Sequence, residues 1–238
     1  MAVATETAAA VLGSPGSGEI VTSFERPPEG VVARLSRLPA ANISDALNKH
    51  GVLHHELRPL DPGMRACGPA LTCGSVDLTV KIYALRLARP GDVFVLAANG
   101  VRDFACFGEL SAHILAARGA AGAVIDGALR DVEGIREAGL PVFARAVTPR
   151  NYHYPFGQPY GSVNAPVVCG GVAVAPGDVV VAGEDGVVVV PRAIAAEVAA
   201  AAEEIAADEA QKREAIGAGA AGPPGIEEAL RGAGYTIR

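Results

Sequence analysis

Two turns of the same composition constrain the fold most, because each leads into an uncharged apolar run. Arg89-Pro-Gly-Asp92 precedes the run 93–97, and Ala175-Pro-Gly-Asp178 precedes the run 179–182. Proline and glycine favour a tight turn, and a short apolar run after such a turn is typical of a strand that is buried on both faces. We therefore expect a buried strand to start at each of these turns.

Strands and helices alternate between the two turns, and short strands dominate after residue 160. The patterns predict helices over 108–117 and 131–138, and strands over 122–125 and 141–144. Further strands are expected over 163–169, 172–174, 179–182 and 187–190. Alternating strands and helices are typical of parallel βαβ units. The sequence therefore predicts an α/β domain whose parallel units precede a β-rich part.

Upstream of the first turn we expect a helix over 43–50, a strand over 64–76 and a helix over 78–88. Asn42, followed by Asp45, is typical of the capped start of a helix, and Gly51 is expected to end this first helix. The second helix has an apolar face that we expect to carry Leu78, Ile82, Leu85 and Leu87.

Both ends of the chain differ in composition from the middle. Residues 1–23 are rich in Ala, Gly, Ser and Thr and are expected to form a flexible tail. Residues 24–192 are expected to form one α/β domain. The segment 193–238 is expected to be a helical extension, whose helix 194–216 carries only a thin apolar stripe of Ile194, Val198 and Ile205. We expect this extension to pack on a neighbouring subunit.

Charge and hydropathy exclude several classes of protein. The chain has 238 residues with a net charge of −6 and a pI of about 5.4. No basic cluster suited to phosphate contacts is evident, so a nucleic-acid partner is not expected. No apolar run reaches the length of a membrane span and no secretion signal is visible, so we expect a cytoplasmic protein without a membrane partner. Cys67, Cys73, Cys106 and Cys169 lack paired spacing and are expected to be buried, reduced thiols.

Polar residues gather where the predicted strand 122–125 gives way to a helix. Arg130 and Asp131 follow Gly127 at this junction, where ligands bind in open α/β sheets. A carboxylate suits Mg²⁺ or Mn²⁺, and a guanidinium can bind a carboxylate with two hydrogen bonds. The alternative is that Asp131 caps the helix and Arg130 is a solvated surface charge. Local pattern alone favours this alternative.

A second candidate segment opens the helix 108–117. Gly108 lets a ligand approach the backbone, and the unpaired N–H groups of the first turn, which includes Leu110 and Ser111, can bind a carboxylate. Taken alone, Glu109 is better explained as a favourable charge at the helix N-terminus. Together the two segments would supply an anion site, a metal ligand and an arginine.

These residues resemble the class II pyruvate aldolases, typified by 4-hydroxy-4-methyl-2-oxoglutarate/4-carboxy-4-hydroxy-2-oxoadipate aldolase, whose fold is shared with the regulator of ribonuclease activity A. The resemblance covers about residues 42–191. It is carried, in order, by Asn42-Ile-Ser-Asp-Ala-Leu47, Pro90-Gly-Asp-Val93, Gly108-Glu-Leu110, Asp126-Gly-Ala-Leu-Arg-Asp131, Pro141-Val-Phe-Ala-Arg145, Pro166-Val-Val-Cys-Gly-Gly171 and Asp185-Gly186. It implies a single-domain layered α/β/β sandwich of the swivelling β/β/α type, with helical terminal extensions.

The resemblance also implies a role for each candidate residue. Asp131 would bind Mg²⁺ or Mn²⁺ directly, Glu109 would hold metal-bound water, and Arg130 would contact the 2-oxo acid end of the substrate. The backbone at Gly108, Leu110 and Ser111 would receive the substrate carboxylate. Another carboxylate would come from a neighbouring subunit of a homotrimer or hexamer whose sites lie at subunit interfaces. Glu204 and Glu209 are the candidates for it.

The chain departs from the family pattern at two places. Family members usually carry an acid three residues after the metal-binding Asp, where this chain has Gly134, so Glu133 is the candidate to bind the metal through water instead. The segment 151–160 is rich in tyrosine and includes His153. It is expected either to cover the substrate or to line a subunit contact.

A carbon–carbon lyase must stabilise an enolate, with either a Schiff-base lysine or a metal. None of Lys49, Lys81 and Lys212 is expected in the crevice between strands and helices, and the histidines do not form a zinc triad. The chemistry expected is therefore metal-dependent cleavage of a 4-hydroxy-2-oxo mono- or dicarboxylic acid to pyruvate and a second oxo acid, with oxaloacetate decarboxylation as a side activity.

Two alternatives remain open at this point: an enzyme that is primarily an oxaloacetate decarboxylase, and a non-catalytic binding protein like the ribonuclease regulator. A methyltransferase is not expected, because no Gly-rich cofactor loop follows a first strand.

Overall fold

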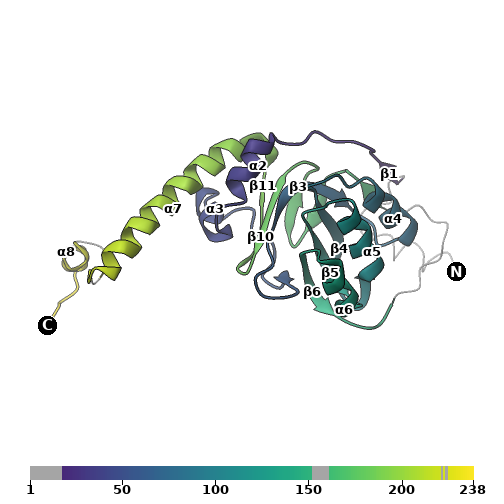
Figure 1. Cartoon of the computed structure of the whole chain (residues 1–238). Coiled ribbons are helices and arrows are strands. Elements are labelled where there is room, and N and C mark those ends of the chain that lie inside the picture. Colours follow the sequence, from purple (N-terminus) through teal and green to yellow (C-terminus); the bar gives the residue numbers. More distant parts are fainter. Residues whose placement is uncertain (1–17, 152–160, 221, 223–224) are drawn as a thin grey trace.

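Four stacked layers make up the body of the molecule in the computed structural model, which describes residues 18–151, 161–220, 222 and 225–238 (Figure 1). The first layer is formed by three helices: α4 (Leu78–Arg86), α5 (Glu109–Ala117) and α6 (Val132–Ala138). They cover one face of the main sheet, which is the second layer. The predicted tail 1–23 and the segment 151–160 lie mostly outside the described residues.

The main sheet has the strand order β1-β7-β3-β4-β5-β6-β2. Its central strands β3, β4, β5 and β6 are parallel, as the βαβ pattern predicts. The strands are β1 (Glu19–Ile20), β2 (Arg58–Pro59), β3 (Ala66–Cys73), β4 (Val93–Phe107), β5 (Gly122–Leu129), β6 (Val142–Val147) and β7 (Ser162–Val163).

A second group of strands forms the third layer, and β3 connects it to the main sheet. The second half of β3 pairs with β4, whereas its first half pairs with β10 in the antiparallel sense, so the strand changes partner between Pro69 and Ala70. The strands of this layer are the hairpin β10 (Val179–Gly183) and β11 (Gly186–Val190) and the hairpin β8 (Val167–Cys169) and β9 (Val172–Val174).

The fourth layer consists of helices from both ends of the chain. They are α2 (Glu29–Leu35), α3 (Ala40–Ala46) and α7 (Ala195–Gly217), with the short 3-10 helix η1 (Arg192–Ile194) before α7. Alternation along β10 explains how one hairpin serves two cores: Val180 packs towards the main sheet, and Val179 and Val181 pack towards these helices. The predicted layered α/β/β sandwich with helical extensions is confirmed.

Both Pro-Gly-Asp turns lead into buried strands, as predicted, and in each the aspartate fixes the turn. Asp92 accepts a hydrogen bond from the Arg89 N–H and two from the Arg26 guanidinium. Asp178 accepts the Ala175 N–H at 2.8 Å and the Arg192 N–H at 2.9 Å. The two carboxylates therefore tie the turns to more distant segments.

Several predicted boundaries and one predicted face are wrong. Helix α3 starts at Ala40 and ends at Ala46, because Asn48 and Lys49 adopt left-handed backbone angles. Beyond the predicted run 93–97, β4 continues to Phe107 as a bulged strand, and the expected strand 163–169 is split into β7 and β8. The buried residues of α4 are Lys81, Ala84 and Leu85, so Leu85 of the predicted face is buried, whereas Leu78 is 43% exposed.

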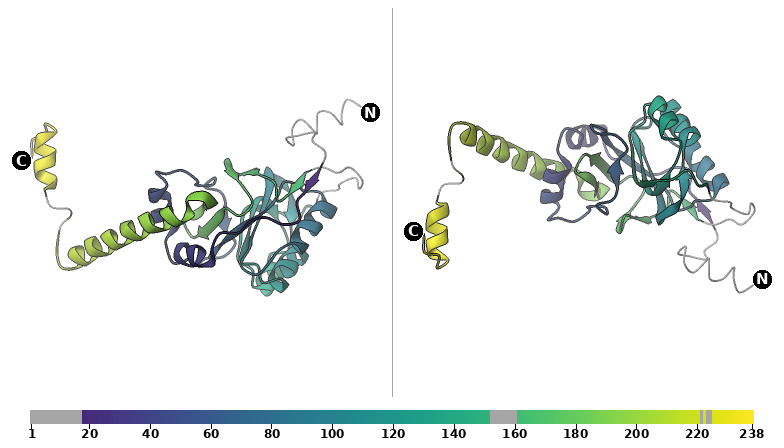
Figure 2. Two further views of the ribbon diagram at one scale, coloured as in Figure 1. Left: turned by 90° about the horizontal axis from the view of Figure 1, so that it is seen from above. Right: turned by 90° about the horizontal axis from the view of Figure 1, so that it is seen from below.

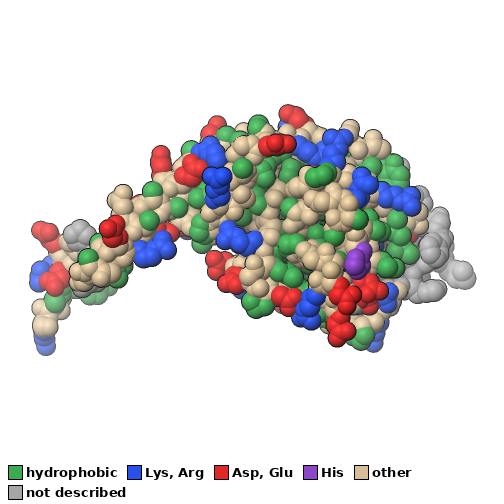
Figure 3. Space-filling view, viewed as in Figure 1, with side chains coloured by type: hydrophobic (Ala, Val, Ile, Leu, Met, Phe, Trp, Pro, Cys, Tyr) green, Lys and Arg blue, Asp and Glu red, His purple; other side chains and the backbone are tan. Residues whose placement is uncertain are grey.

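Helix α7 belongs to the body over its first half and projects from it over the second half. Its buried residues are Ala195, Val198, Ala199 and Ala202. Figure 2 shows α7 leaving the layered body, with α8 (Ile226–Gly232) beyond its end. Acidic and basic side chains both lie along this part of the surface in the space-filling view (Figure 3), and α7 itself carries mainly acidic ones. Among the described residues, no helix combines the length and the apolar character that a membrane span requires.

The four cysteines are free thiols, of which Cys67 is half-buried and the other three are buried, close to the expectation. Burial raises the pKa of Cys106 to about 11 and that of Cys73 to about 12.

Candidate active site

A cavity of about 360 Å³ opens where β4 and β5 end and where α5 and α6 begin. It brings together six of the seven residues predicted for substrate and metal, although they come from two separate segments: Gly108, Glu109, Leu110, Ser111, Arg130 and Asp131. The remaining lining residues are Asp77, Leu78, Lys81, Ala105, Cys106, Phe107 and Asn151. The cavity thus lies at the carboxyl ends of parallel strands, where such sheets bind ligands.

The bulged course of β4 sets the position of Arg130. Leu96 pairs with Ile125 and Phe107 pairs with Leu129, so the long intervening stretch of β4 bulges before the two strands meet again. The Arg130 N–H then donates to the Phe107 carbonyl oxygen at 3.0 Å. The start of α5 and the start of α6 are therefore held side by side.

Asp131 occupies the position before the first residue of α6, but it does not cap the helix. Its backbone is left-handed, with φ 59° and ψ 47°, and its side chain accepts no capping hydrogen bond. Aspartate tolerates left-handed backbone angles better than most residues, but they cost conformational free energy that the usual extended backbone before a helix does not. Its Oδ2 instead lies 3.3 Å from Arg130 Nε, with both side chains part-exposed to the cavity. This geometry removes the physical basis of the helix-cap alternative.

Gly108 is required for space and not for backbone freedom. Its φ of −158° is extended and open to any residue. A Cβ at this position would lie 2.6 Å from Asp131 Oδ2 and 3.4 Å from Arg130 Cγ. The absent side chain thus leaves room for the carboxylate of Asp131 beside the start of α5.

The first turn of α5 offers unpaired N–H groups to the cavity. The Ser111 N–H donates to the Gly108 carbonyl oxygen at 3.1 Å, whereas the N–H groups of Glu109 and Leu110 have no acceptor among the described residues. The free amides of the predicted anion site are therefore those of Glu109 and Leu110, whereas the predicted Ser111 amide is already bonded. The Leu110 side chain is 74% exposed at the rim of the cavity.

Glu109 crosses from α5 to α6 over Gly134. A Cβ at residue 134 would lie 2.1 Å from Glu109 Oε2 and 2.7 Å from Glu109 Cβ. A larger residue at 134, including the acid that the family usually carries there, is incompatible with this position of Glu109. Glu133 is exposed and lines a neighbouring hollow together with Glu109 and Asp131, outside the main cavity.

The donor set fits a hard divalent cation that keeps most of its water. Among residues 18–151 and the later described segments, no three His, Cys, Asp or Glu side chains gather as a ready-made metal cage. Mg²⁺, however, typically takes one or two carboxylates and retains several waters. Asp131 presents an oxygen freed from helix capping into the space left by Gly108, and Glu109 lies beside it. These two residues would hold such a cation.

Lys81 is the residue of the cavity that the sequence patterns missed. The expectation that no lysine enters the crevice is wrong, because the face of α4 that carries Lys81 turns inwards and the side chain lines the cavity. Lys81 is only 5% exposed, and its Nζ donates to the Cys106 carbonyl oxygen at 2.6 Å. Burial lowers the pKa of Lys81, and the charge of Arg130 lowers it further. The spacing of Lys81 with Ala84, Leu85 and Ala88 was the available signal.

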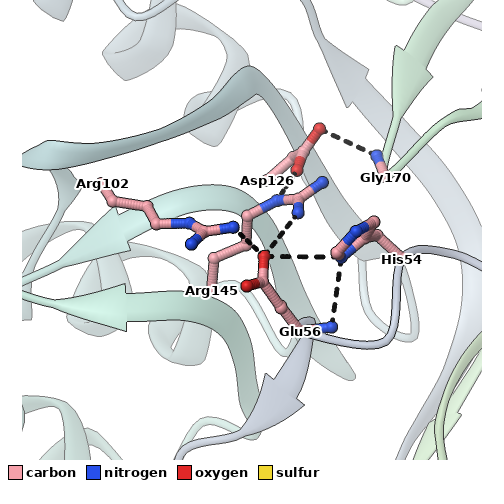
Figure 4. A network of polar contacts seen from close by, with 6 residues as sticks. All are labelled: His54, Glu56, Arg102, Asp126, Arg145 and Gly170. Atoms are coloured by element: carbon pink, nitrogen blue, oxygen red, sulfur yellow. Dashed lines mark hydrogen bonds and ion pairs between the residues drawn. The ribbon is translucent and has the colours of Figure 1, made fainter.

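A network of charges fixes the strands just before the site (Figure 4). Asp126 on β5 accepts Arg145 Nε from β6 at 2.5 Å and the Gly170 N–H from the β8–β9 turn at 2.8 Å. Glu56 accepts Arg145 Nη1 at 3.0 Å and also pairs with Arg102 and His54. The network holds β5, β6 and the β8–β9 hairpin together, upstream of Arg130.

Two further predicted features have different outcomes. Glu209 accepts a hydrogen bond from Asn42 Nδ2 at 2.8 Å within its own chain, whereas Glu204 is exposed. His153 and the tyrosines of the segment 151–160 lie outside the described residues.

Comparisons with known proteins agree with this architecture. Residues 40–189 match the RraA-like family model, described as Aldolase/RraA. A relative from Halalkalibacterium halodurans, named "Putative 4-hydroxy-4-methyl-2-oxoglutarate aldolase", is 33% identical over 78% of this chain and 88% of its own length.

Two solved structures share the fold. Streptomyces coelicolor RraAS2, described as an unusual member of the RNase ES inhibitor RraA protein family, has a TM-score of 0.70 and 31% identity over 79% of this chain and 99% of its own. An uncharacterized protein from Pseudomonas syringae has a TM-score of 0.70 and 28% identity over 83% and 96% of the two chains.

Proposed function

The chain belongs to the RraA-like family, Aldolase/RraA, and we propose that it is a divalent-metal-dependent lyase that cleaves a 4-hydroxy-2-oxo mono- or dicarboxylic acid to pyruvate and a second oxo acid. One observation carries the proposal: the uncapped carboxylate of Asp131 lies in the space left by Gly108, next to Arg130 and to the free amides of α5. An anion site, a cation and a metal ligand thus share one cavity.

Each residue has a role that its chemistry supports. The free N–H groups of Glu109 and Leu110, in the first turn that also contains Gly108 and Ser111, receive the carboxylate of the pyruvyl half at the N-terminus of α5. Arg130 contacts the 2-oxo group and stabilises the negative charge of the enolate that bond cleavage leaves. When bound at Asp131, Mg²⁺ or Mn²⁺ supplies Lewis-acid stabilisation of the same charge. Glu109, and Glu133 from the neighbouring hollow, hold ordered water at the site.

Cleavage also requires that the 4-hydroxyl group of the substrate lose its proton. Glu109 lies in the cavity wall and is placed to orient the water that takes this proton, while its side chain is kept in position by the close approach of Gly134. Decarboxylation of oxaloacetate produces the same enolate, so we propose it as a companion activity.

The test is pyruvate formation from 4-hydroxy-4-methyl-2-oxoglutarate and from oxaloacetate, with Mg²⁺, with chelator, and in Arg130→Ala and Asp131→Ala variants. Loss of one group that stabilises the enolate should lower kcat by at least about 100-fold. Arg136→Ala is the matched control, because Arg136 lies on α6, directly after Arg130 and Asp131, and pairs with Asp61 away from the cavity. Activity that survives Asp131→Ala would refute the assigned metal ligand.

The same assay separates the alternatives. A protein that decarboxylates oxaloacetate but does not cleave the aldol substrate is primarily a decarboxylase. The similarity to RraAS2, described as a member of an RNase inhibitor family, supports the other alternative, a non-catalytic binding protein. Absence of metal-dependent pyruvate from both substrates would favour that alternative.

We further propose a homotrimer or hexamer with a site at each subunit interface. Exposed apolar side chains next to the site, Leu110 at 74% and Val147 at 58%, support a protein contact there. Glu209 is engaged with Asn42, so exposed Glu204 is the better candidate for the carboxylate that a neighbour supplies. Light scattering gives the subunit number, and Glu204→Gln should lower activity without changing that number.

A further inference from the structure

Lys81 leaves a buried positive charge in the cavity wall without a carboxylate partner. Lys81 is 5% exposed, and the one hydrogen bond of its side chain among the described residues is to the Cys106 carbonyl oxygen. No carboxylate of the described residues lies within salt-bridge distance of its Nζ, although Asp77 lines the same cavity and caps α4 through the N–H groups of Thr79 and Val80.

Such an ammonium group has unused binding capacity. It carries three N–H donors, of which the Cys106 carbonyl accepts one. A buried charge with unsatisfied donors is costly unless a partner of opposite charge arrives. The cavity is where such a partner would enter, because Lys81 is part of its wall.

Arg130 and Lys81 are two separate cationic groups of the cavity, because they come from different elements. Arg130 comes from the end of β5 and already pairs with Asp131 at 3.3 Å. Lys81 comes from α4, which packs beside β3 on the other side of β4. β4 lies between β3 and β5 in the sheet, and its end, from Ala105 to Phe107, lines the cavity. A ligand with two anionic ends would therefore find a cation towards each end.

We propose that Lys81 binds the second carboxylate, the one distal to the 2-oxo group, of a small dicarboxylic 2-oxo acid. The inference rests on the proposed function and adds to it the residue that distinguishes diacids from monoacids. The cavity of about 360 Å³ is at the small end of ligand sites, which suits an acid of five or six carbons. The pyruvyl carboxylate occupies the α5 amides, and the distal carboxylate satisfies the free donors of Lys81.

The test compares two substrates that differ in the distal group alone. 4-Hydroxy-2-oxoglutarate carries a carboxylate where 4-hydroxy-2-oxopentanoate carries a methyl group, and both yield pyruvate on cleavage. In Lys81→Met we expect kcat/KM for the diacid to fall by about 10- to 100-fold, mainly through KM, as loss of a charge-assisted hydrogen bond implies. The value for the monoacid should change by less than about threefold. Equal losses for both substrates would overturn the proposal.

Two further variants control for charge and for folding. Lys81→Arg keeps the charge and should restore part of the preference for the diacid. Lys81→Gln keeps a donor for the Cys106 carbonyl without the charge, so it tests the same loss if Lys81→Met does not fold. Lys49→Met is the matched control, because Lys49 is exposed and pairs with Asp45 away from the cavity. A normal preference in Lys81→Gln would overturn the proposal.

A binding experiment keeps this inference separate from the proposed function. With chelator present and no turnover, glutarate should raise the thermal unfolding temperature of the wild-type protein more than butyrate does, and Lys81→Gln should abolish the difference. If this dependence is found in a protein that forms no pyruvate, the proposed function fails, but the binding of a distal carboxylate by Lys81 stands. If the unfolding temperature of the wild-type protein rises equally with both acids, the binding of a distal carboxylate by Lys81 is refuted. Covalent trapping of pyruvate on Lys81 by borohydride would also overturn it, because the ammonium would then be an imine-forming amine.

Discussion

Gly108→Ala is the most informative single change, because the structure predicts a large effect on function with little effect on stability. The backbone at residue 108 is extended, so alanine fits it without strain. The new Cβ would lie 2.6 Å from Asp131 Oδ2, and an ordinary contact needs about 3.4 Å, so the carboxylate must move by about 0.8 Å. The Asp131 side chain is 36% exposed and can swing away at little cost. The free energy of unfolding should therefore change by less than about 1 kcal/mol.

Function should respond much more strongly, because the carboxylate that moves is the proposed metal ligand. A misplacement of about 1 Å at a reacting centre lowers rates by about 100-fold, so we expect kcat/KM to fall by about 10- to 100-fold. Affinity for Mn²⁺, measured by calorimetry without substrate, should fall in parallel. Gly30→Ala is the control, because nothing lies within 4 Å of its Cβ. Wild-type activity and Mn²⁺ affinity in Gly108→Ala would refute the reasoning, as would a large loss of stability.

Three further predictions concern stability. Gly134→Ala should destabilise the protein by about 1–3 kcal/mol in urea unfolding, although alanine usually stabilises a helix, because its Cβ would collide with Glu109. Arg145→Met should cost about 3–5 kcal/mol, since it leaves a buried carboxylate on β5 without its partner, whereas the exposed control Arg136→Met should cost less than about 1 kcal/mol. Burial raises the pKa of Glu56, but hydrogen bonding from Arg145 and nearby positive charges outweigh this and hold it below its usual value. A lowered folded-state pKa adds stability at neutral pH that is lost on acidification, so the difference in unfolding temperature between wild type and Glu56→Gln should disappear from about pH 5 to pH 3.

Local sequence signals predicted the parts of the fold that depend on short-range chemistry. The two Pro-Gly-Asp turns fix their own geometry, because Asp92 and Asp178 each bond to a backbone N–H three residues earlier. The junction of β5 and α6 was also visible, since an apolar run ends in glycine and polar residues follow. Joining Arg130 to the start of α5, however, needed the family motifs, because the bulge in β4 that brings them together has no periodic signature.

The residues that were missed depend on long-range packing. The predicted face of α4 correctly included Leu85, but it also included exposed Leu78 and omitted Ala84 and Lys81, which the main sheet covers. Small residues pack closely against a sheet, so size alone misleads about which face is buried. The role of Asp126 likewise depends on Arg145 and Gly170, which lie 19 and 44 residues further along the chain.

Two glycines show how the absence of side chains can define a site. Neither Gly108 nor Gly134 has the positive φ that usually explains a glycine. Each is the place where a carboxylate from the other helix start lies: Asp131 from α6 reaches towards Gly108, and Glu109 from α5 crosses Gly134. The reciprocal arrangement holds two negative side chains close to one cavity while α5 and α6 stay in contact. A divalent cation would balance that charge, so the glycine at 134, which departs from the family pattern, is compatible with a metal site in which Glu109 supplies the second carboxylate.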